Sequence, residues 1–277
     1  MKPARFDYVR ATDAAHAAAL LADAQDDDTA NAKPIAGGQS LGPMLNLRLA
    51  RPALLVDVRG CPDMRGFVDE GDAIVYGAAT THAEIEDARV PDALDGHLAA
   101  AARRIAYRAV RNRGTLGGSL SHADPAADWP TVLLAVNAEV IVRGPDGLRA
   151  EALRDFVRGP FTVSLAAHEL VVGVRVPRHG PALRWGYHKL SVKVGEFAHA
   201  FAVAMEDPTT GERRAVVGAI ERVPLVLEGN DTHMDDAGQA EALLAQHLPD
   251  LPPVKLRLHA AVLWRAIRAL TPEATPS

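Results

Sequence analysis

Cysteine is nearly absent from this sequence. The 277 residues contain a single cysteine, Cys61. One thiol cannot form a disulfide within the chain, and it cannot supply the ligand set of an iron–sulfur cluster or of a structural zinc site. We therefore expect Cys61 to be a free thiol in a cytoplasmic protein.

The sequence also lacks a long apolar run and a surplus of positive charge. No segment reaches the roughly 18 apolar residues that a membrane span requires, and the N-terminal stretch MKPARFDYVRATD has no apolar signal core. The chain carries 30 lysines and arginines against 35 aspartates and glutamates, a formal net charge of −5. Sequence-independent nucleic-acid binding needs excess basic residues that face phosphates, so we expect neither a nucleic-acid partner nor a membrane span.

Apolar periodicity and the glycine and proline breaks divide the chain into helices and strands. The strand–helix–strand pattern of residues 33–58 predicts parallel neighbours, because a helix is the usual connection between parallel strands. His179-Gly180-Pro181 interrupts both regular structures and indicates a boundary near residues 178–181. Expected helices cover residues 14–24, 40–49, 91–107, 131–136, 235–247 and 254–270, another begins at His82, and residues 111–130 are expected as a loop. Expected strands cover residues 33–36, 54–58, 73–78, 138–144, 169–176, 183–190, 198–205 and 215–221, the last three forming an antiparallel sheet.

The first candidate site is the glycine turn Ala36-Gly37-Gly38-Gln39-Ser40, which precedes an expected helix. Consecutive glycines allow main-chain N–H groups to converge on one point, which suits a pyrophosphate. Residues 38–42 also fit G-x-S-x-G, the turn that carries the nucleophilic serine of α/β-hydrolases. A purely structural turn is the third interpretation.

The second candidate site is Thr115-Leu116-Gly117-Gly118-Ser119, again a hydroxyl beside paired glycines. Asp124 and Asp128 follow it, and paired carboxylates suit the hydroxyls of a ribose and the amino group of an adenine. They could instead cap the helix that follows. His122 with the two aspartates is a weak metal candidate, since no second histidine or cysteine lies nearby.

The hydrolase interpretation has little support elsewhere in the sequence. Several later histidines could serve as a base, but the fold would need more strands and an oxyanion loop before residue 36. It also assigns no role to residues 115–128. The phosphate interpretation accounts for both glycine turns.

Three segments together resemble a known family. They are AGGQSLGPMLNLRLARP at 36–52, VRNRGTLGGSLSHADPAADWP at 110–130 and YHKLSVKVGEFAHAFAVAM at 187–205. They resemble the FAD-binding medium subunits of molybdenum hydroxylases, a family that includes the medium subunit of carbon monoxide dehydrogenase and the flavin domain of xanthine dehydrogenase. The resemblance extends from residue 1 to about residue 270.

This resemblance implies an α+β fold of the vanillyl-alcohol-oxidase (PCMH) type. It implies two FAD-binding subdomains, residues 1–58 and 59–178, and a C-terminal domain, residues 179–277, with a three-stranded antiparallel sheet and helices. The implied FAD contacts fall into three groups. Pyrophosphate contacts are Ala36, Gly37, Gly38, Gln39, Ser40 and Leu41 on the first turn, and Thr115, Gly117, Gly118 and Ser119 on the second. Ribose and adenine contacts are Asp124 and Asp128. Flavin neighbours are Ile105, Val171 and Phe197, the last two placed by looser spacing. Lys189 is implied to approach the cofactor, although it could equally be solvated.

The implied function is electron transfer within a larger assembly. Non-covalent FAD on this chain receives electrons from [2Fe–2S] clusters on a small partner subunit and passes them to an external acceptor. A large partner subunit carries the molybdenum cofactor, and the implied assembly is a dimer of heterotrimers. No side chain of this chain is implied as a catalytic acid or base, and no metal is bound by it. A stand-alone FAD-dependent oxidase is the alternative, and a serine hydrolase using Ser40 is a remote one.

The sequence differs from the residues expected in this family at two places. Tyr107-Arg108 stands where a histidine and a proline are expected. Phe197 stands where the carbon monoxide enzyme carries tyrosine.

Overall fold

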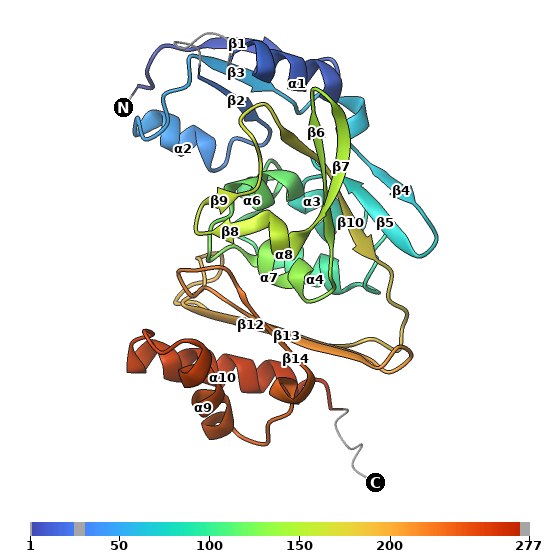
Figure 1. The fold of residues 1–277 in the computed structure, drawn as a ribbon, viewed down its shortest axis with the longest axis vertical. Coiled ribbons are helices and arrows are strands. Elements are labelled where there is room, and N and C mark those ends of the chain that lie inside the picture. The colour runs from blue at the N-terminus through green and yellow to red at the C-terminus, as the bar shows by residue number, and fades with distance from the viewer. Residues whose placement is uncertain (1, 25–30, 272–277) are drawn as a thin grey trace.

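The computed structural model describes residues 2–24 and 31–271. Three larger sheets follow one another along the long axis of the molecule, and the described residues also form one two-stranded sheet (Figure 1). The polar run predicted to end the first helix, residues 26–31, lies outside the described residues except for Asn31. In the part that is described, no helix is long and apolar enough to cross a membrane.

The N-terminal sheet contains three parallel strands in the order β1-β3-β2. Its elements are β1 (Asp7–Arg10), α1 (Ala14–Asp23), β2 (Ala32–Ile35), α2 (Leu41–Asn46) and β3 (Leu54–Asp57). Helix α1 begins at the cap residue Asp13, whose side chain accepts a hydrogen bond from the N–H of His16 at 2.8 Å. The parallel pairing of β2 and β3 confirms the prediction for residues 33–58.

The middle sheet has five antiparallel strands in the order β4-β5-β10-β6-β7. Its strands are β4 (Phe67–Asp69), β5 (Ala73–Gly77), β6 (Glu139–Gly144), β7 (Gly147–Ala152) and β10 (Leu170–Pro177), and β8 (Val157–Gly159) pairs separately with β9 (Thr162–Val163). The helices in this middle part of the chain are the 3-10 helix η1 (Pro62–Met64), α3 (His82–Glu86), α4 (His97–Arg103), α5 (Arg108–Arg111), α6 (Leu116–His122), α7 (Asp128–Leu134) and α8 (Leu153–Phe156).

Two predictions for this region are wrong. The expected helix 91–107 is shortened to α4 because Asp95 and Gly96 adopt left-handed conformations before it and Ala106 does so after it. The expected loop 111–130 contains α6, whose first turn holds both glycines of the second candidate site. Thr115 caps this helix by accepting a hydrogen bond from the N–H of Gly118 at 3.1 Å, which offsets the low helix propensity of glycine.

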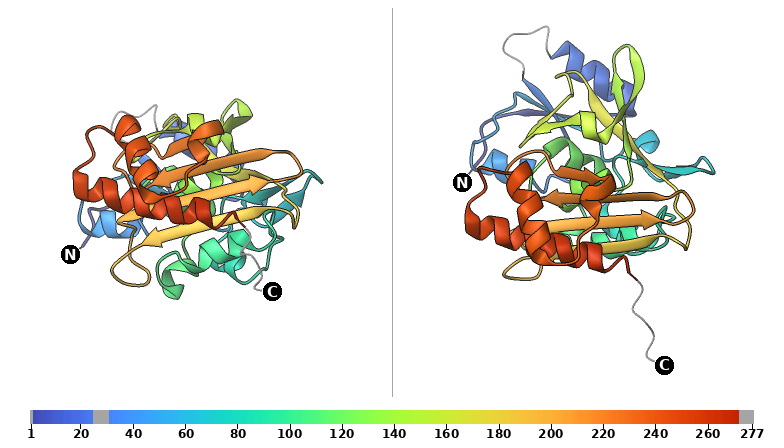
Figure 2. Two further views of the ribbon diagram at one scale, coloured as in Figure 1. Left: turned by 90° about the horizontal axis from the view of Figure 1, so that it is seen from below. Right: turned by 60° about the horizontal axis from the view of Figure 1, so that its bottom comes forward.

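The C-terminal sheet is antiparallel, as predicted, but has four strands instead of three, in the order β11-β12-β13-β14. Its elements are β11 (Arg184–Leu190), β12 (Ala200–Asp207), β13 (Glu212–Gly218), β14 (Leu225–Glu228), the 3-10 helix η2 (Gly229–Thr232), α9 (Ala237–His247) and α10 (Pro253–Arg268). Helices α9 and α10 cover one face of this sheet (Figure 2), and α7 packs against β12 and β13. The sheet therefore joins its own helices to the middle part of the molecule.

Glycines allow the helices to approach this sheet closely. A Cβ atom at Gly186 of β11 would lie 1.8 Å from the main-chain oxygen of Ala266 in α10. One at Gly218 of β13 would lie 2.1 Å from the hydroxyl of Thr131 in α7. Any side chain at these positions would force the layers apart.

Candidate functional site

The first glycine turn connects β2 to α2 and presents unpaired main-chain donors. Gly38 has a φ of +69°, a conformation that glycine adopts without steric cost. Within the described parts of the chain, no acceptor receives the N–H groups of Gly38, Gln39, Ser40 or Leu41. Consecutive N–H groups without partners form a concave anion-binding surface of the kind that holds phosphates.

The first glycine turn lies against the residues that directly precede the second, although the two turns are far apart in the sequence. A Cβ atom at Gly37 would lie 1.9 Å from the main-chain oxygen of Arg113 and 2.9 Å from the Cα of Gly114. The side chain of Arg113 reaches back, and its Nε lies 3.4 Å from the carbonyl oxygen of Gly37. The structure therefore brings the first turn against the residues that lead into Thr115.

The second turn differs from the first in the donors that it can offer. The N–H groups of Leu116 and Gly117 donate to the carbonyl oxygens of Thr80 and Ala78, both at 2.9 Å. Those of Gly118 and Ser119 donate to the hydroxyl and the carbonyl oxygen of Thr115. The second turn can therefore contribute the hydroxyl of Ser119 and close main-chain packing, whereas the free amides belong to the first turn.

The two aspartates after the second turn are in different environments. Asp124 stabilises the turn before α7, because its Oδ1 accepts a hydrogen bond from the N–H of Ala126 at 2.9 Å. Asp128 is the first residue of α7 and is buried. The predicted capping role thus describes Asp124 in part, while the cap position itself is Ala127. Among the described residues, no group of three or more His, Cys, Asp or Glu side chains could hold a metal ion.

Asp128 forms a buried cluster with two residues of β11. The Nζ of Lys189 lies 3.0 Å from both carboxylate oxygens, and the hydroxyl of Tyr187 donates to Oδ1. The side chains of Asp128 and Lys189 are only 5% and 6% exposed, which rules out a solvated Lys189. Burial raises the pKa of Asp128, while the Lys189 ammonium and the Tyr187 hydroxyl oppose that rise. Sequence reasoning missed Tyr187, although the two-residue spacing to Lys189 places both on one face of the strand.

The remaining predicted flavin neighbours differ in exposure. Ile105 is half-buried and packs against the main core, and Val171 is buried in β10. Phe197 is 63% exposed in the connection between β11 and β12. In the same connection, Gly195 lies so close to Tyr107 that an added Cβ would be 3.0 Å from its ring. Tyr107 and Phe197, the two residues that differ from those expected in the family, are therefore associated with one surface loop.

The geometry gives no support to a nucleophilic Ser40. Within the described residues, no histidine forms a hydrogen bond to its side chain. Both ring nitrogens of His259 are engaged by main-chain oxygens, and His188 contacts Arg265. A serine nucleophile requires a hydrogen-bonded base, which is not present here.

Comparisons with known proteins agree with this geometry. Residues 4–179 match the family described as FAD binding domain in molybdopterin dehydrogenase. Subunit alpha of the 6-hydroxypseudooxynicotine dehydrogenase complex of Paenarthrobacter nicotinovorans is 37% identical over 264 residues, which cover 95% of this chain and 85% of the relative. The medium chain of carbon monoxide dehydrogenase from Hydrogenophaga pseudoflava is 38% identical over 200 residues, covering 72% of this chain and 68% of that one.

Solved structures show the same relationship. A structure of carbon monoxide dehydrogenase from Hydrogenophaga pseudoflava that lacks the Mo-pyranopterin moiety contains a chain with a TM-score of 0.85, 30% identity and 98% coverage of both chains. Quinoline 2-oxidoreductase from Pseudomonas putida 86 contains one with a TM-score of 0.83, 30% identity and 98% coverage of both. This chain therefore belongs to the family of FAD-binding domains in molybdopterin dehydrogenases, as an FAD-binding medium subunit of the molybdenum hydroxylases.

Proposed function

We propose that this chain holds FAD non-covalently and passes electrons from the [2Fe–2S] clusters of a small partner subunit to an external acceptor. A large partner subunit would carry the molybdenum cofactor. Bound FAD would supply the redox chemistry, and the protein would supply its binding and orientation. The single cysteine supports this division, because the chain itself cannot ligate an iron–sulfur cluster.

The contact between the two glycine turns is the observation that carries the proposal. The free N–H groups of residues 38–41 would hold the pyrophosphate, with Ala36 and Gly37 shaping the approach. Thr115, Gly117, Gly118 and Ser119 would close the other side. Because Gly37 packs directly on Arg113, one diphosphate could bridge both turns and so connect the first two parts of the chain.

The remaining contacts are proposed from the family resemblance and are refined by the geometry. Ile105, Val171 and Phe197 would lie near the flavin, although Val171 is buried in β10. Asp124 and Asp128 would lie near the ribose and adenine. The carboxylate of Asp128 already accepts hydrogen bonds from Lys189 and Tyr187, so we propose that it fixes the position of the Lys189 ammonium beside the cofactor.

The detailed architecture and the assembly are part of the same proposal. The three sheets lie within residues 1–58, 59–178 and 179–277, which supports two subdomains of the vanillyl-alcohol-oxidase type and a C-terminal domain. A dimer of heterotrimers is the assembly we propose. A cytoplasmic location is consistent with one buried cysteine that has no disulfide partner.

Purification of a tagged chain from cells that express its partners tests the proposal. We expect a yellow protein whose flavin is released by denaturation and identified as FAD, together with two co-purifying subunits that contain molybdenum and iron. The chain purified alone should bind FAD but should not turn over a substrate without partners, which separates it from a stand-alone oxidase. A colourless protein that takes up no FAD would contradict the proposal.

A further inference from the structure

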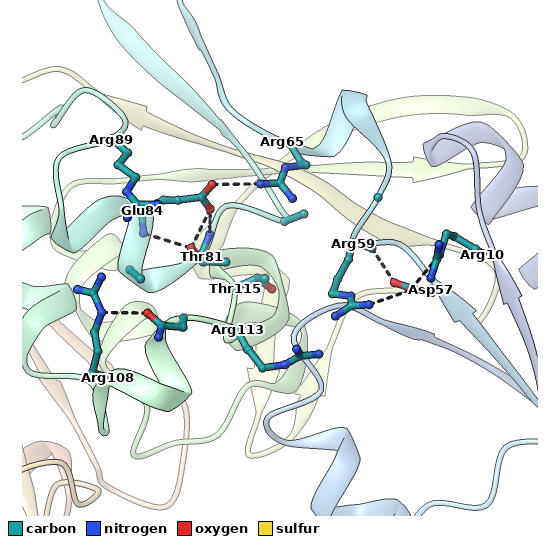
Figure 3. Close-up of a pocket in the computed structure, with 14 residues that line it drawn as sticks. Arg10, Asp57, Arg59, Arg65, Thr81, Glu84, Arg89, Arg108, Arg113 and Thr115 are labelled. Carbon is teal, nitrogen blue, oxygen red and sulfur yellow. Dashed lines mark hydrogen bonds and ion pairs between the residues drawn. The ribbon is translucent and has the colours of Figure 1, made fainter.

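A pocket lined by arginines lies between the N-terminal sheet and helices α3 and α5 (Figure 3). Its volume is about 600 Å³, and its lining includes Arg10, Arg59, Arg65, Arg89, Arg108 and Arg113. It shares Thr115 with the proposed FAD contacts but none of the residues of the first glycine turn. The pocket adjoins the first glycine turn through Arg113, whose Nε lies 3.4 Å from the carbonyl oxygen of Gly37, but that turn does not line it. The proposed electron transfer assigns no role to its arginines.

The lining concentrates positive charge in a chain that is acidic overall. Six arginines face two lining carboxylates, Asp57 and Glu84. Arg89 pairs with Asp87 and Arg108 with Glu86, both carboxylates lying behind the lining. The other four arginines against the two lining carboxylates leave a formal charge of +2. The whole chain has a formal net charge of −5. Placing like charges around one cavity costs free energy unless an anion compensates them.

The two lining carboxylates are already engaged. Asp57 is buried and contacts the guanidinium groups of Arg10 and Arg59 at 3.7 and 3.4 Å. Its carboxylate also accepts a hydrogen bond from the hydroxyl of Tyr8. Glu84 uses one oxygen for Arg65 at 3.2 Å and the other for the N–H and hydroxyl of Thr81. These two carboxylates therefore accept hydrogen bonds from only a few of the guanidinium N–H groups in the lining.

Three of the arginines keep most of their donors free. Within the described residues, Arg113 contacts only the carbonyl oxygen of Gly37, and the side chain of Arg89 pairs only with Asp87, at 3.1 Å. Arg10 is held only by its long contact with Asp57. Each guanidinium carries five N–H donors in a planar fork. Figure 3 shows Arg59 and Arg113 extending from opposite sides of the pocket toward its middle.

We propose that this pocket binds a phosphate-bearing small molecule, such as a nucleotide, at a second site beside the FAD cleft. The planar guanidinium fork matches the oxygens of a phosphate group and binds them with two parallel hydrogen bonds. The volume lies in the usual range for small-molecule sites, and arginines from several elements converge on a concave surface. A stable protein partner would instead cover about 800 Å² of this chain.

Calorimetric titration of the full-length, FAD-loaded chain with inorganic pyrophosphate and with ADP tests this proposal. We expect saturable binding of one anion per chain that weakens with added salt and leaves FAD bound. Arg59→Gln should weaken binding about tenfold, the loss expected for one charge-assisted hydrogen bond. Arg59→Gln also removes an ion-pair partner from the buried Asp57, so a second variant is needed. Arg89→Gln serves this purpose, because Arg89 is exposed and its partner Asp87 keeps its ion pair with Arg108.

Arg257→Gln is the matched control, since it removes the same charge from an exposed position on α10. It should leave the affinity within about twofold of the parent. Displacement of FAD by pyrophosphate would overturn the proposal, because the arginines would then belong to the FAD cleft. Absence of binding at millimolar anion would also overturn it. In the complex purified with its partners, loss of the small subunit from the Arg89→Gln variant would also overturn the proposal, because the surface would then bind an acidic protein.

Discussion

The Cα of Gly37 lies against the main-chain carbonyl of Arg113, so closely that a methyl group at position 37 would stand 1.9 Å from that oxygen. Residues 37 and 113 lie in two different connections, one between β2 and α2 and one between α5 and α6. Their contact is the point at which the N-terminal sheet meets the second glycine turn. The proposed pyrophosphate site at the two turns would depend on this contact.

Gly37→Ala should therefore separate the two turns. The backbone must shift to relieve the overlap, and a shift of this kind costs about 1–3 kcal/mol of folding free energy. FAD binding should fall more than tenfold, because the free N–H groups of residues 38–41 would no longer face the second turn. Equilibrium unfolding and fluorescence titration with FAD measure the two effects.

Gly42→Ala is the control for that substitution. Gly42 lies in α2, and an added Cβ would meet no heavy atom within 4 Å. Alanine is favoured over glycine within a helix, so stability should be unchanged or higher by up to about 1 kcal/mol. Equal FAD affinities in the two variants would contradict the role given to the Gly37 contact.

Thr115→Val should loosen the second turn while keeping the shape of the side chain. The variant loses the hydroxyl that accepts the N–H of Gly118, and removal of such a cap costs about 1 kcal/mol. Thr115→Ser keeps the hydroxyl and should behave as the parent. Thermal unfolding of the three proteins compares them, and a stable valine variant that retains all its FAD would show that the cap is dispensable.

Lys189→Met should be strongly destabilising. It leaves the buried carboxylate of Asp128 without its cationic partner, a loss that costs about 3–5 kcal/mol. The double variant Asp128→Asn/Lys189→Met should recover part of that loss, since no unpaired charge stays buried. Lys255→Met, at an exposed pair with Glu221, should change the free energy of unfolding by less than about 1 kcal/mol. Similar losses at positions 189 and 255, measured by urea unfolding, would argue against a buried ion pair.

Stability should fall with acid through His82, which lies beneath the second turn. Burial lowers the pKa of His82 from 6.5 to about 4, with a smaller contribution from Arg111. Below pH 6.5, His82 binds a proton in the unfolded chain but not in the folded chain. Its contribution to the free energy of unfolding is therefore fully present above pH 6.5 and is lost between pH 6.5 and 4. Between pH 7.5 and 5 the expected loss from this group is about 2 kcal/mol.

His82→Gln isolates the contribution of this histidine. Glutamine does not titrate, and its side-chain oxygen can still accept the hydrogen bond that Trp129 donates to the ring, at 3.0 Å in the parent. The variant should lose less stability than the parent over the same pH range. Parallel pH dependences in urea unfolding would show that His82 is already protonated in the folded protein or is not buried.

Local sequence patterns predicted those elements whose signals are local. The strand–helix–strand unit of residues 33–58 and the two C-terminal helices follow from periodicity and breaks over short windows. Helix α6 was missed because Gly117 and Gly118 argue against a helix, whereas Gly117 is needed to pack against Ala78.

The candidate site could likewise be predicted from local sequence only in part. The glycine turns were visible in the sequence, but their contact depends on the packing of β2 against a loop 76 residues later. The partners of Asp128 lie on a strand of the C-terminal sheet, and the arginine pocket gathers residues from at least three elements. No spacing along the chain predicts such contacts, because they arise from tertiary packing.

A crystal structure of the chain with bound FAD tests the central claim most directly. We expect the pyrophosphate to accept hydrogen bonds from the main-chain N–H groups of Gly38 to Leu41 and to touch the turn at Thr115 to Ser119. Phosphates held instead by the arginine pocket, or FAD bound to only one of the two turns, would contradict it.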